Sequence, residues 1–400
     1  MNPKRERPET ENATKNRPSH VREQWGLAGQ SNMQGGGLLR DTLPPDTRVR
    51  VFSSAGRWEV AETPLHRLWE SFTESHLRLL RGYHRTPAEI SNTVMAQKEA
   101  RLRVTGAGLD LAFGQAMADA TGKGIDLIPC AHGGTSLDQW SPLHKGEASL
   151  YGAMLERIRR ANGKLSGVLW YQGESDNAAG LAETYGSRLK RWMEALRRDT
   201  GQPKLPIYLV QVGRIVMPPS NQSQPISGWE TVREAQRLLG EDMPQSGVTS
   251  AIDLGLVDYI HLDSSSLIRL GKRLARLALG HPSPRVKGLF RHRKEEKFRG
   301  GNGVVQVRCT GLAGGWSHVE KPLSGFSVRT PHGEPHPDLC IVQAEVPKDN
   351  TGLIRLILNK PFDESIRIGY GLGLNPFCNV ADTADMPLCA FLPQKVISTS

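Results

Sequence analysis

The chain has 400 residues, more than the roughly 250 to 300 at which one hydrophobic core stops growing, so we expect more than one folding unit. Its 38% hydrophobic and 23% charged residues are ordinary for a globular protein and exclude a chain that is disordered throughout. The net charge of +10 would suit a nucleic-acid partner only if it covered a binding face.

Most of that charge lies in two short segments. Residues 1–22 hold six Lys or Arg against three Glu, and residues 281–300 hold seven against two. The second segment, around RHRKEEKFRGG, has no interleaved aromatic residues for base stacking. We therefore interpret residues 1–22 as a disordered basic tail and residues 284–302 as a solvated basic linker, and we expect no nucleic-acid partner.

No stretch approaches the roughly 18 apolar residues of a membrane span, and the N-terminal residues lack the apolar segment of a signal peptide. We expect no membrane association and, by default, a cytoplasmic location. The five cysteines form no CxxC pair, so a thiolate zinc site is not expected. They are interpreted as buried small side chains, with a Cys378–Cys389 disulfide as the alternative.

From the tail to the linker, short apolar runs alternate with helical patterns, which predicts an α/β unit with a parallel sheet over residues 23–283. Apolar side chains recur at helical spacing in residues 151–161 and 266–279, and WETVREAQRLL predicts a third helix. The segment SHVREQWGLA is unusually polar for a first buried strand. The other predicted strands are residues 125–129, 167–171, 207–212 and 248–252.

After residue 300 the pattern changes to short β-rich pieces separated by Gly, Pro and Asp. Residues 303–400 are therefore expected to form a smaller, mostly β domain. The pieces are VVQVRC, LCIVQAEV, LIRLIL and IRIGY.

The motifs of phosphate-binding loops, dinucleotide sites, zinc proteases and GxSxG hydrolases are all missing from the sequence. What remains is four polar clusters, three of them just after a predicted strand, where ligands bind in open α/β sheets. The first is GLAGQSNMQGGG at residues 26–37, in which Ser31 lies among small residues. Two interpretations stay open at this point, an exposed nucleophile or a helix cap.

The second cluster, DYIHLD, places Asp258 and His261 three residues apart, so that they can share one face of a turn before a helix that starts near residues 264–266. Such a pair suits a general base and the carboxylate that orients it. Asp253 and Asp263 are alternatives for the carboxylate, although Asp253 is more readily interpreted as bracing the loop.

The third cluster, WYQGESDN, offers the Gln172 amide as a donor to a developing oxyanion. Its Glu174 is a second acid or base or, as we favour, a structural acceptor. The fourth, CAHGGTSLDQW, contains Gly133, Gly134 and Thr135, which permit close approach of a backbone to a substrate.

Taken together and in this order, the clusters resemble the SGNH hydrolases, specifically the sialate O-acetylesterase and acetylxylan-esterase-like carbohydrate esterases. The similarity covers about residues 20–280. Residues 311–328 and 366–391 are also similar to the C-terminal region of sialate O-acetylesterases, which favours that type over the xylan type. The five matching segments are GQSNM, TGAGLDLAFG, PCAHGGTSLDQW, WYQGESD and DYIHL.

The resemblance implies a three-layer, flavodoxin-like parallel sheet with helices on both faces, and chemistry without a metal or cofactor. It implies Ser31 as nucleophile, His261 as general base and Asp258 as its orienting carboxylate. The oxyanion hole would combine the backbone N–H groups of Ser31 and Gly106 with the Gln172 amide, Gly108 being the alternative to Gly106. Further residues expected to support the site are Gln30, Asn32, Gly133, Gly134, Thr135 and Glu174.

The expected function is removal of O-acetyl groups from carbohydrates through an acyl-enzyme, with an acetylated carbohydrate as the partner. The alternatives are an acetylesterase of xylan or another polysaccharide, and a glycan-binding protein without catalysis on the same scaffold. His132 departs from the apolar or aromatic residue expected before GGTS. Trp140, Tyr171 and the loop from Trp58 to Arg103 are candidates for sugar stacking or a lid, with simple packing as the alternative.

Overall fold

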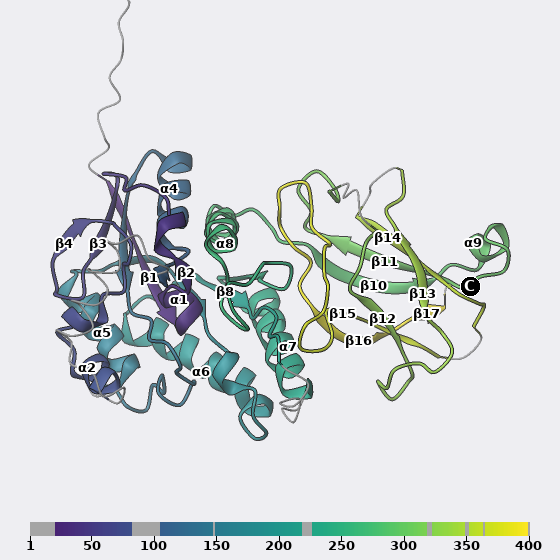
Figure 1. Ribbon diagram of the computed structural model, residues 1–400, viewed down its shortest axis with the longest axis horizontal. Helices are drawn as coiled ribbons and strands as arrows, with labels where there is room; N and C mark the ends of the chain where they lie inside the picture. Colours follow the sequence, from purple (N-terminus) through teal and green to yellow (C-terminus); the bar gives the residue numbers. More distant parts are fainter. Residues whose placement is uncertain are drawn as a thin grey trace, which may run out of the picture.

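The computed structural model describes residues 21–81, 105–146, 149–217, 226–317, 322–348, 352–362 and 365–398. Of the proposed basic tail at residues 1–22, only residues 21 and 22 are described. The Trp58 to Arg103 loop is described up to residue 81, and its remainder lies outside the described residues. Figure 1 shows an α/β unit built from the first part of the chain and a β-rich unit built from the last part.

The α/β unit is built on a seven-stranded sheet in which all neighbouring strands are parallel except the β3–β4 pair. The four strands expected from apolar runs are confirmed as β6, β7, β8 and β9. The strands in spatial order are β4 (Trp58–Val60), β3 (Val49–Phe52), β6 (Gly124–Pro129), β1 (Arg22–Gly29), β7 (Leu165–Tyr171), β8 (Ile207–Gln211) and β9 (Ser246–Ser250).

Helices cover both faces of this sheet (Figure 1). On the central strand β1, Trp25 contacts Phe113 of α4, whereas a side chain at the next residue, Gly26, would meet Met154 of α5. Because successive strand residues face opposite sides, α4 and α5 lie on opposite faces. The helix α8 packs against α4, and α6 packs against α7. The bounds are α4 (Asp110–Thr121), α5 (Leu150–Arg160), α6 (Ala182–Asp199), α7 (Ile226–Asp242) and α8 (Ser264–Ala278).

Short elements complete the unit near the ends of the strands. They are α1 (Ser31–Gln34), α2 (Glu74–Arg81), the paired strands β2 (Gly37–Leu38) and β5 (Thr105–Ala107), and the 3-10 helices η1 (Leu39–Asp41), η2 (Leu68–Glu70) and η3 (Glu174–Asp176).

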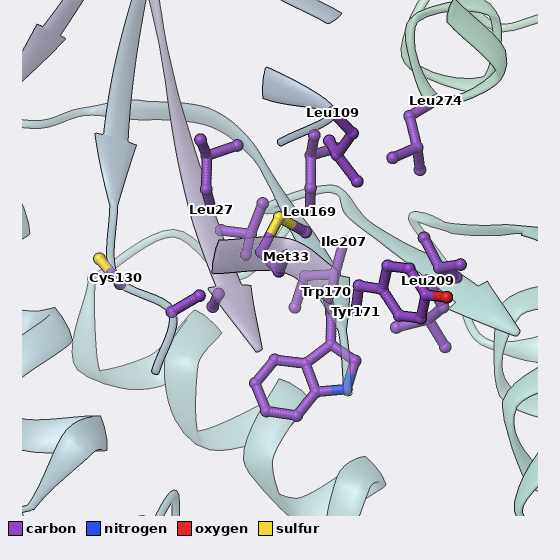
Figure 2. Close-up of a cluster of buried hydrophobic side chains, with 14 of the residues drawn as sticks. Leu27, Met33, Leu109, Cys130, Leu169, Trp170, Tyr171, Ile207, Leu209 and Leu274 are labelled. Carbon is purple, nitrogen blue, oxygen red and sulfur yellow. The ribbon is translucent and has the colours of Figure 1, made fainter. Parts of the chain in front are cut away.

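The core of the unit is made by the inward-facing residues of these strands and helices. Figure 2 shows Leu27 of β1 and Leu169 of β7 near Met33 of α1, whereas the ring of Trp170 points away from Met33. Trp170 contacts Trp192 of α6 and Trp140. Burying a large apolar side chain contributes roughly 1.5 to 3 kcal/mol, so this core holds the strand ends in fixed positions.

The polar start of β1 has a physical explanation. The Arg22 guanidinium donates to the buried Asp126 carboxylate of β6 at 2.6 Å, and Arg50 of β3 binds the same carboxylate at 2.8 Å. Glu23 pairs with Lys123 at 2.6 Å. The charged residues of the first strand are therefore paired with charges in β6 and directly before it.

The β-rich unit consists of a five-stranded sheet and a three-stranded sheet. The first has the order β13 (Ile341–Glu345), β14 (Leu353–Leu358), β11 (Val304–Thr310), β10 (Arg285–Arg291), β17 (Ile397–Ser398), and the second β12 (Phe326–Arg329), β15 (Arg367–Tyr370), β16 (Phe391–Lys395). Buried side chains of this unit, among them Trp316, Ile354 and Tyr370, form a second hydrophobic core.

The prediction of a solvated linker at residues 284–302 is wrong. That segment forms β10, which pairs with β11 in the sheet, and the helix α9 (Arg293–Phe298). Some of its charges are paired: Arg291 binds Glu296 at 2.8 Å, and Arg299 binds Glu345 of β13. The β-rich unit therefore begins at about residue 285.

All five cysteines are free thiols, so the alternative of a Cys378–Cys389 disulfide is wrong as well. Four of them are buried, as expected of small core side chains, and Cys340 is exposed. Among the residues described, there is no helix with both the length and the apolar character that a membrane crossing requires.

Candidate active site

An open pocket of about 570 Å³ lies beyond the carboxyl ends of the central strands β1, β6 and β7. This is the edge at which open α/β sheets bind ligands. The pocket is lined by the segments that follow β1, β6, β7 and β9 and by two leucines. Its lining residues are Gln30, Ser31, Gln34, Gly35, Gly36, Leu68, Leu80, His132, Gly133, Gly134, Glu174, Ser175, Asp258, Tyr259, Ile260 and His261.

Ser31 lies at the turn from β1 into α1. Gly29 ends the strand with φ of +140°, and a side chain there would overlap the carbonyl of Tyr171, so the turn needs glycine. The N-cap residue of α1 is Gln30, and no side chain caps this helix. The interpretation of Ser31 as a helix cap is therefore wrong. Its hydroxyl makes no hydrogen bond to any described residue and lines the pocket.

His261 and Asp258 form the pair that their spacing predicts. The His261 Nδ1 lies 2.7 Å from Asp258 Oδ2, and Asp258 Oδ1 accepts the backbone N–H groups of Ile260 at 2.8 Å and His261 at 2.7 Å. Burial would raise the pKa of the Asp258 carboxyl, but the hydrogen bonds from His261 and from these N–H groups outweigh it and lower that pKa. Asp258 is therefore ionised and fixes the orientation of the ring.

The other two aspartates are occupied elsewhere. Asp253 binds Arg273 at 2.6 Å, which agrees with its expected bracing role. Asp263 is the N-cap of α8 and accepts the Ser266 N–H at 2.8 Å. Neither contacts His261 in the described structure.

Ser31 and His261 line the same pocket without a hydrogen bond between them. Their segments are nevertheless in contact, because a Cβ at Gly36 would lie 2.8 Å from the His261 Cβ. In structures without a substrate, catalytic hydrogen bonds are often long and tighten only when the substrate binds.

Asn32, beside Ser31, ties three segments of the site together. Its amide nitrogen donates to Glu174 Oε1 at 2.9 Å and to the Ile260 carbonyl at 3.3 Å, while its oxygen accepts the Leu262 N–H at 3.0 Å. Asn32 thus holds both sides of His261. Burial raises the pKa of Glu174, although the hydrogen bond from Asn32 opposes this. Glu174 thus accepts a hydrogen bond from Asn32, as the structural interpretation predicts, and it also lines the pocket.

Gln172 is placed differently from the expected oxyanion donor. Its side chain is fully buried outside the pocket lining, and its Nε2 donates to Asp176 Oδ2 at 2.6 Å and to the Thr135 carbonyl at 3.1 Å. The two N–H groups of one amide are thereby used. Nothing in this geometry directs the Gln172 amide toward Ser31.

Two side-chain amides line the pocket, those of Gln30 and Gln34, and Gln30 directly precedes Ser31. Its Oε1 accepts from the backbone N–H groups of Gly173 at 3.5 Å and Ser175 at 3.3 Å and from Gln172 Nε2 at 3.3 Å. Because backbone N–H groups identify this atom as oxygen, the other amide atom is the nitrogen. The Gln30 Nε2 makes no hydrogen bond to the described residues. The sequence had assigned Gln30 only a supporting position.

The expected glycine of the oxyanion hole also lies elsewhere. Gly106 belongs to β5 and lies against Gly35, and neither Gly106 nor Gly108 lines the pocket. In contrast, Gly133 and Gly134 do, and a Cβ at Gly133 would lie 3.4 Å from the Ser31 Cβ.

The N–H of Gly133 donates to Gln34 Oε1 at 2.7 Å. Gln34 was not among the residues expected at the site, although it belongs to the same Gly-rich cluster as Ser31. The expected supporting residue Thr135 lies deeper: its hydroxyl donates to the His132 carbonyl at 2.7 Å and accepts from Trp140 Nε1 at 3.2 Å. Thr135 therefore fixes the turn rather than facing the pocket.

His132, the residue that departs from the family pattern, belongs to a buried group of histidines at the pocket floor. Its Nδ1 lies 2.8 Å from the Nδ1 of His76, and the two rings stack. Burial lowers the pKa of His132 to about 4 and that of His66 to about 3. These rings are neutral near pH 7, so His132 presents a neutral polar surface to the pocket.

Two aromatic candidates for sugar stacking are core residues. The Trp140 side chain is fully buried against Trp170, and Tyr171 is 1% exposed. The alternative of simple packing is correct for both. Within the described ranges, no group of three or more His, Cys, Asp or Glu side chains is arranged to hold a metal ion.

Comparison with known sequences gives one consistent result. A family model described as carbohydrate esterase, sialic acid-specific acetylesterase, matches residues 22–280. The chain is also 31% identical over 281 residues to a probable carbohydrate esterase of Arabidopsis thaliana, across 64% of this chain and 89% of that relative.

Two solved structures are also similar. That of an Arabidopsis thaliana protein has 28% identity and a TM-score of 0.48, and the match covers 64% of this chain and 98% of that one. That of a novel carbohydrate acetylesterase from Xanthomonas citri has 19% identity and a TM-score of 0.63, and the match covers 93% of this chain and 80% of that one. The second likeness is one of fold, and it extends over both units.

Proposed function

Because the chain belongs to the sialic acid-specific acetylesterase family of carbohydrate esterases, we propose that it is a serine esterase that removes O-acetyl groups from a carbohydrate. The observation that carries this proposal is that Ser31 and the hydrogen-bonded His261–Asp258 pair line one pocket. We assign the α/β unit to the SGNH hydrolases on the same residues.

In the proposed mechanism, the Ser31 Oγ attacks the ester carbonyl while the His261 Nε2 takes the hydroxyl proton. Asp258 holds the Nδ1–H and stabilises the imidazolium that forms. His261 then returns the proton to the departing sugar hydroxyl, which leaves acetyl-Ser31. A water molecule, deprotonated by His261, attacks this ester, releases acetate and restores Ser31. Substrate binding must bring the serine and the imidazole into hydrogen-bonding reach.

The tetrahedral intermediates carry an oxyanion that needs donors next to Ser31. We assign this role to the backbone N–H groups of Ser31 and Gly134 and to the Nε2 of Gln30. All three residues line the pocket, and these donors make no hydrogen bond to the described residues. Gly133 is not used, because its N–H is held by Gln34.

From the family to which the chain belongs, we infer that the substrate is an O-acetylated sialic acid. One observation favours a neutral acetylated sugar, such as acetylated xylan, as the second candidate. The described lining residues include two carboxylates, Asp258 and Glu174, but no Lys or Arg that would pair with the carboxylate of a sialic acid.

Measuring the release of acetate tests both the serine mechanism and the choice of sugar. The full-length chain is incubated with acetylated sialic acid, acetylated xylo-oligosaccharides and acetylated hexoses, and acetate is measured. We expect release from at least one sugar by the wild-type chain and none by Ser31→Ala. Equal release by the two proteins would exclude the serine mechanism, and no release from any sugar would exclude the proposed function.

A further inference from the structure

The loop that carries Asp258 and His261 is braced internally by the Asp258 carboxylate, which accepts two backbone N–H groups, and by backbone hydrogen bonds between its two arms. It runs from the end of β9 to the start of α8, and one backbone bond, from Val257 N–H to the His261 carbonyl at 2.8 Å, closes its tip. These bonds fix the shape of the loop, whereas its position relative to Ser31 depends on the segments that lie beside it. We refer to residues 253–262 as the catalytic loop.

The segment after β8 lies along this loop. The Val216 N–H donates to the Tyr259 carbonyl at 2.8 Å, between the two catalytic side chains in the sequence. Arg214 donates to the Leu254 carbonyl at 3.1 Å, near the start of the loop. Residues 213–216 thus hold the catalytic loop at two points.

The β-rich unit in turn holds residues 213–216. The Ile215 N–H donates to the Leu374 carbonyl at 2.9 Å, and the other terminal nitrogen of Arg214 donates to Asn375 Oδ1 at 3.0 Å. Leu374 and Asn375 follow β15 in the β-rich unit. Arg214 therefore connects that unit directly to the catalytic loop.

A buried arginine fixes the position of the segment that contains Leu374. Arg233 of α7 is 1% exposed, and its guanidinium donates to the carbonyls of Gly373 and Gly213, both at 2.6 Å. Glu230 of the same helix accepts the Gly373 N–H at 2.6 Å. A buried charge is stable only when its donors are satisfied, so these partners hold both segments strongly.

A second tie reaches the start of the catalytic loop. Arg273 of α8, also 1% exposed, binds Asp253 at 2.6 Å and Asp385 of the β-rich unit at 2.9 Å. Arg269 binds Asp385 as well, at 2.5 Å. The first residue of the loop is thereby linked to the β-rich unit through one guanidinium.

We propose that the β-rich unit acts as a positioning element for catalysis, holding the Asp258–His261 pair in register with Ser31 through Asn375 and Arg214. This inference rests on the proposed esterase function. Asn375 and Arg214 touch neither substrate nor reacting atoms. Their effect is on the fraction of molecules in which His261 is aligned, which changes kcat more than KM.

The test compares Asn375→Ala with Asn375→Asp and with Asn379→Ala in the full-length chain. Asp at position 375 still accepts from Arg214. Asn379 is a matched control, because it accepts the Ser324 N–H at 2.8 Å and donates to the Pro322 carbonyl at 3.0 Å, both within the β-rich unit. The readouts are kcat and KM on p-nitrophenyl acetate, the melting temperature, and hydrogen–deuterium exchange of the catalytic-loop amides.

We expect Asn375→Ala to lower kcat by about tenfold at unchanged KM, since a misplacement of 1 Å can cost about 100-fold. Exchange of residues 253–262 should become faster, and Asn375→Asp should restore both values. Asn379→Ala should leave kcat and this exchange unchanged even if it melts earlier. Arg214→Met removes the donor of the same hydrogen bond, so it should reproduce the Asn375→Ala result.

Wild-type kcat and wild-type exchange in Asn375→Ala would overturn the proposal. An equal loss in Asn379→Ala would also overturn it, because the effect would then be general destabilisation. Activity that survives in Ser31→Ala would instead refute the esterase mechanism. The exchange comparison would still decide whether the β-rich unit holds the loop.

Discussion

Gly36 and His261 are in such close contact that a Cβ at position 36 would lie 2.8 Å from the Cβ of the histidine. The segment that carries the proposed nucleophile therefore packs directly on the side chain of the proposed base. This contact therefore limits how the imidazole ring can lie relative to Ser31, in addition to the hydrogen bond from the ring to Asp258.

Gly36→Ala should displace His261 and lower kcat on p-nitrophenyl acetate by about 10- to 100-fold. The matched control is Gly146→Ala, because an added Cβ there meets no atom within 4 Å. Steady-state kinetics of the two variants are compared. Equal kcat values would show that the contact can relax without consequence.

Ser31→Ala should abolish esterase activity, with a loss of up to about a millionfold in kcat. Because the Ser31 hydroxyl makes no hydrogen bond to the described residues, the melting temperature should stay within a degree or two of wild type. Substantial activity in a fully folded Ser31→Ala variant would show that the nucleophile is another residue.

Gln30 and Gln172 should differ in the kind of damage that their substitution causes. Gln30→Glu keeps the oxygen that accepts the Gly173 and Ser175 N–H groups but removes the free N–H donors, so kcat should fall about 100- to 1000-fold.

Gln172→Met removes the donor to Asp176, so it should lower the free energy of unfolding by about 1 to 3 kcal/mol and kcat far less. Kinetics and chemical denaturation of both variants are the measurements. A large loss of kcat in Gln172→Met with little loss in Gln30→Glu would instead identify Gln172 as the oxyanion donor.

Asp110 makes the stability depend on pH. Burial raises the pKa of this carboxyl from 3.8 to about 7, with an opposing effect from the Leu111 N–H, and its Oδ2 has no hydrogen-bond partner among the described residues. Between these two values the unfolded chain has lost the proton and the folded chain keeps it. The contribution of Asp110 to stability is therefore fully present below pH 3.8 and lost as the pH rises to about 7.

Asp110→Asn should remove this dependence while its amide oxygen still accepts the Leu111 N–H. The melting temperature of the variant minus that of the wild type should increase from pH 4 to pH 7.5. A difference that stays constant over this range would show that Asp110 is ionised in the folded protein.

The parts of the fold that sequence predicts well are those set by local pattern. The continuous apolar runs at residues 125–129 and 207–212 are strands, and the spacing of Asp258 and His261 gives their hydrogen bond. A period of apolar residues or a three-residue spacing is fixed within one segment, so no distant information is needed.

The errors concern side chains whose partners are distant in the sequence or hidden by local composition. The charges of residues 284–302 indicated a linker because the partner of Arg299, Glu345, is 46 residues away. The polar strand β1 is satisfied by Asp126, about 100 residues on. For Gln172, nothing local tells whether an amide at a strand end turns toward a pocket or toward Asp176.

The two hydrophobic cores share members across the unit boundary. Met386 and Cys389 of the C-terminal part are packed in the core of the α/β unit, and Ile252 of the α/β unit is packed in the other. Truncation of the chain after α8 would expose Ile252 to solvent and would remove the Gly373 carbonyl that accepts from the Arg233 guanidinium. We therefore expect residues 22–280 to lose stability when they are produced without the β-rich unit, so engineering of this protein has to keep both parts together.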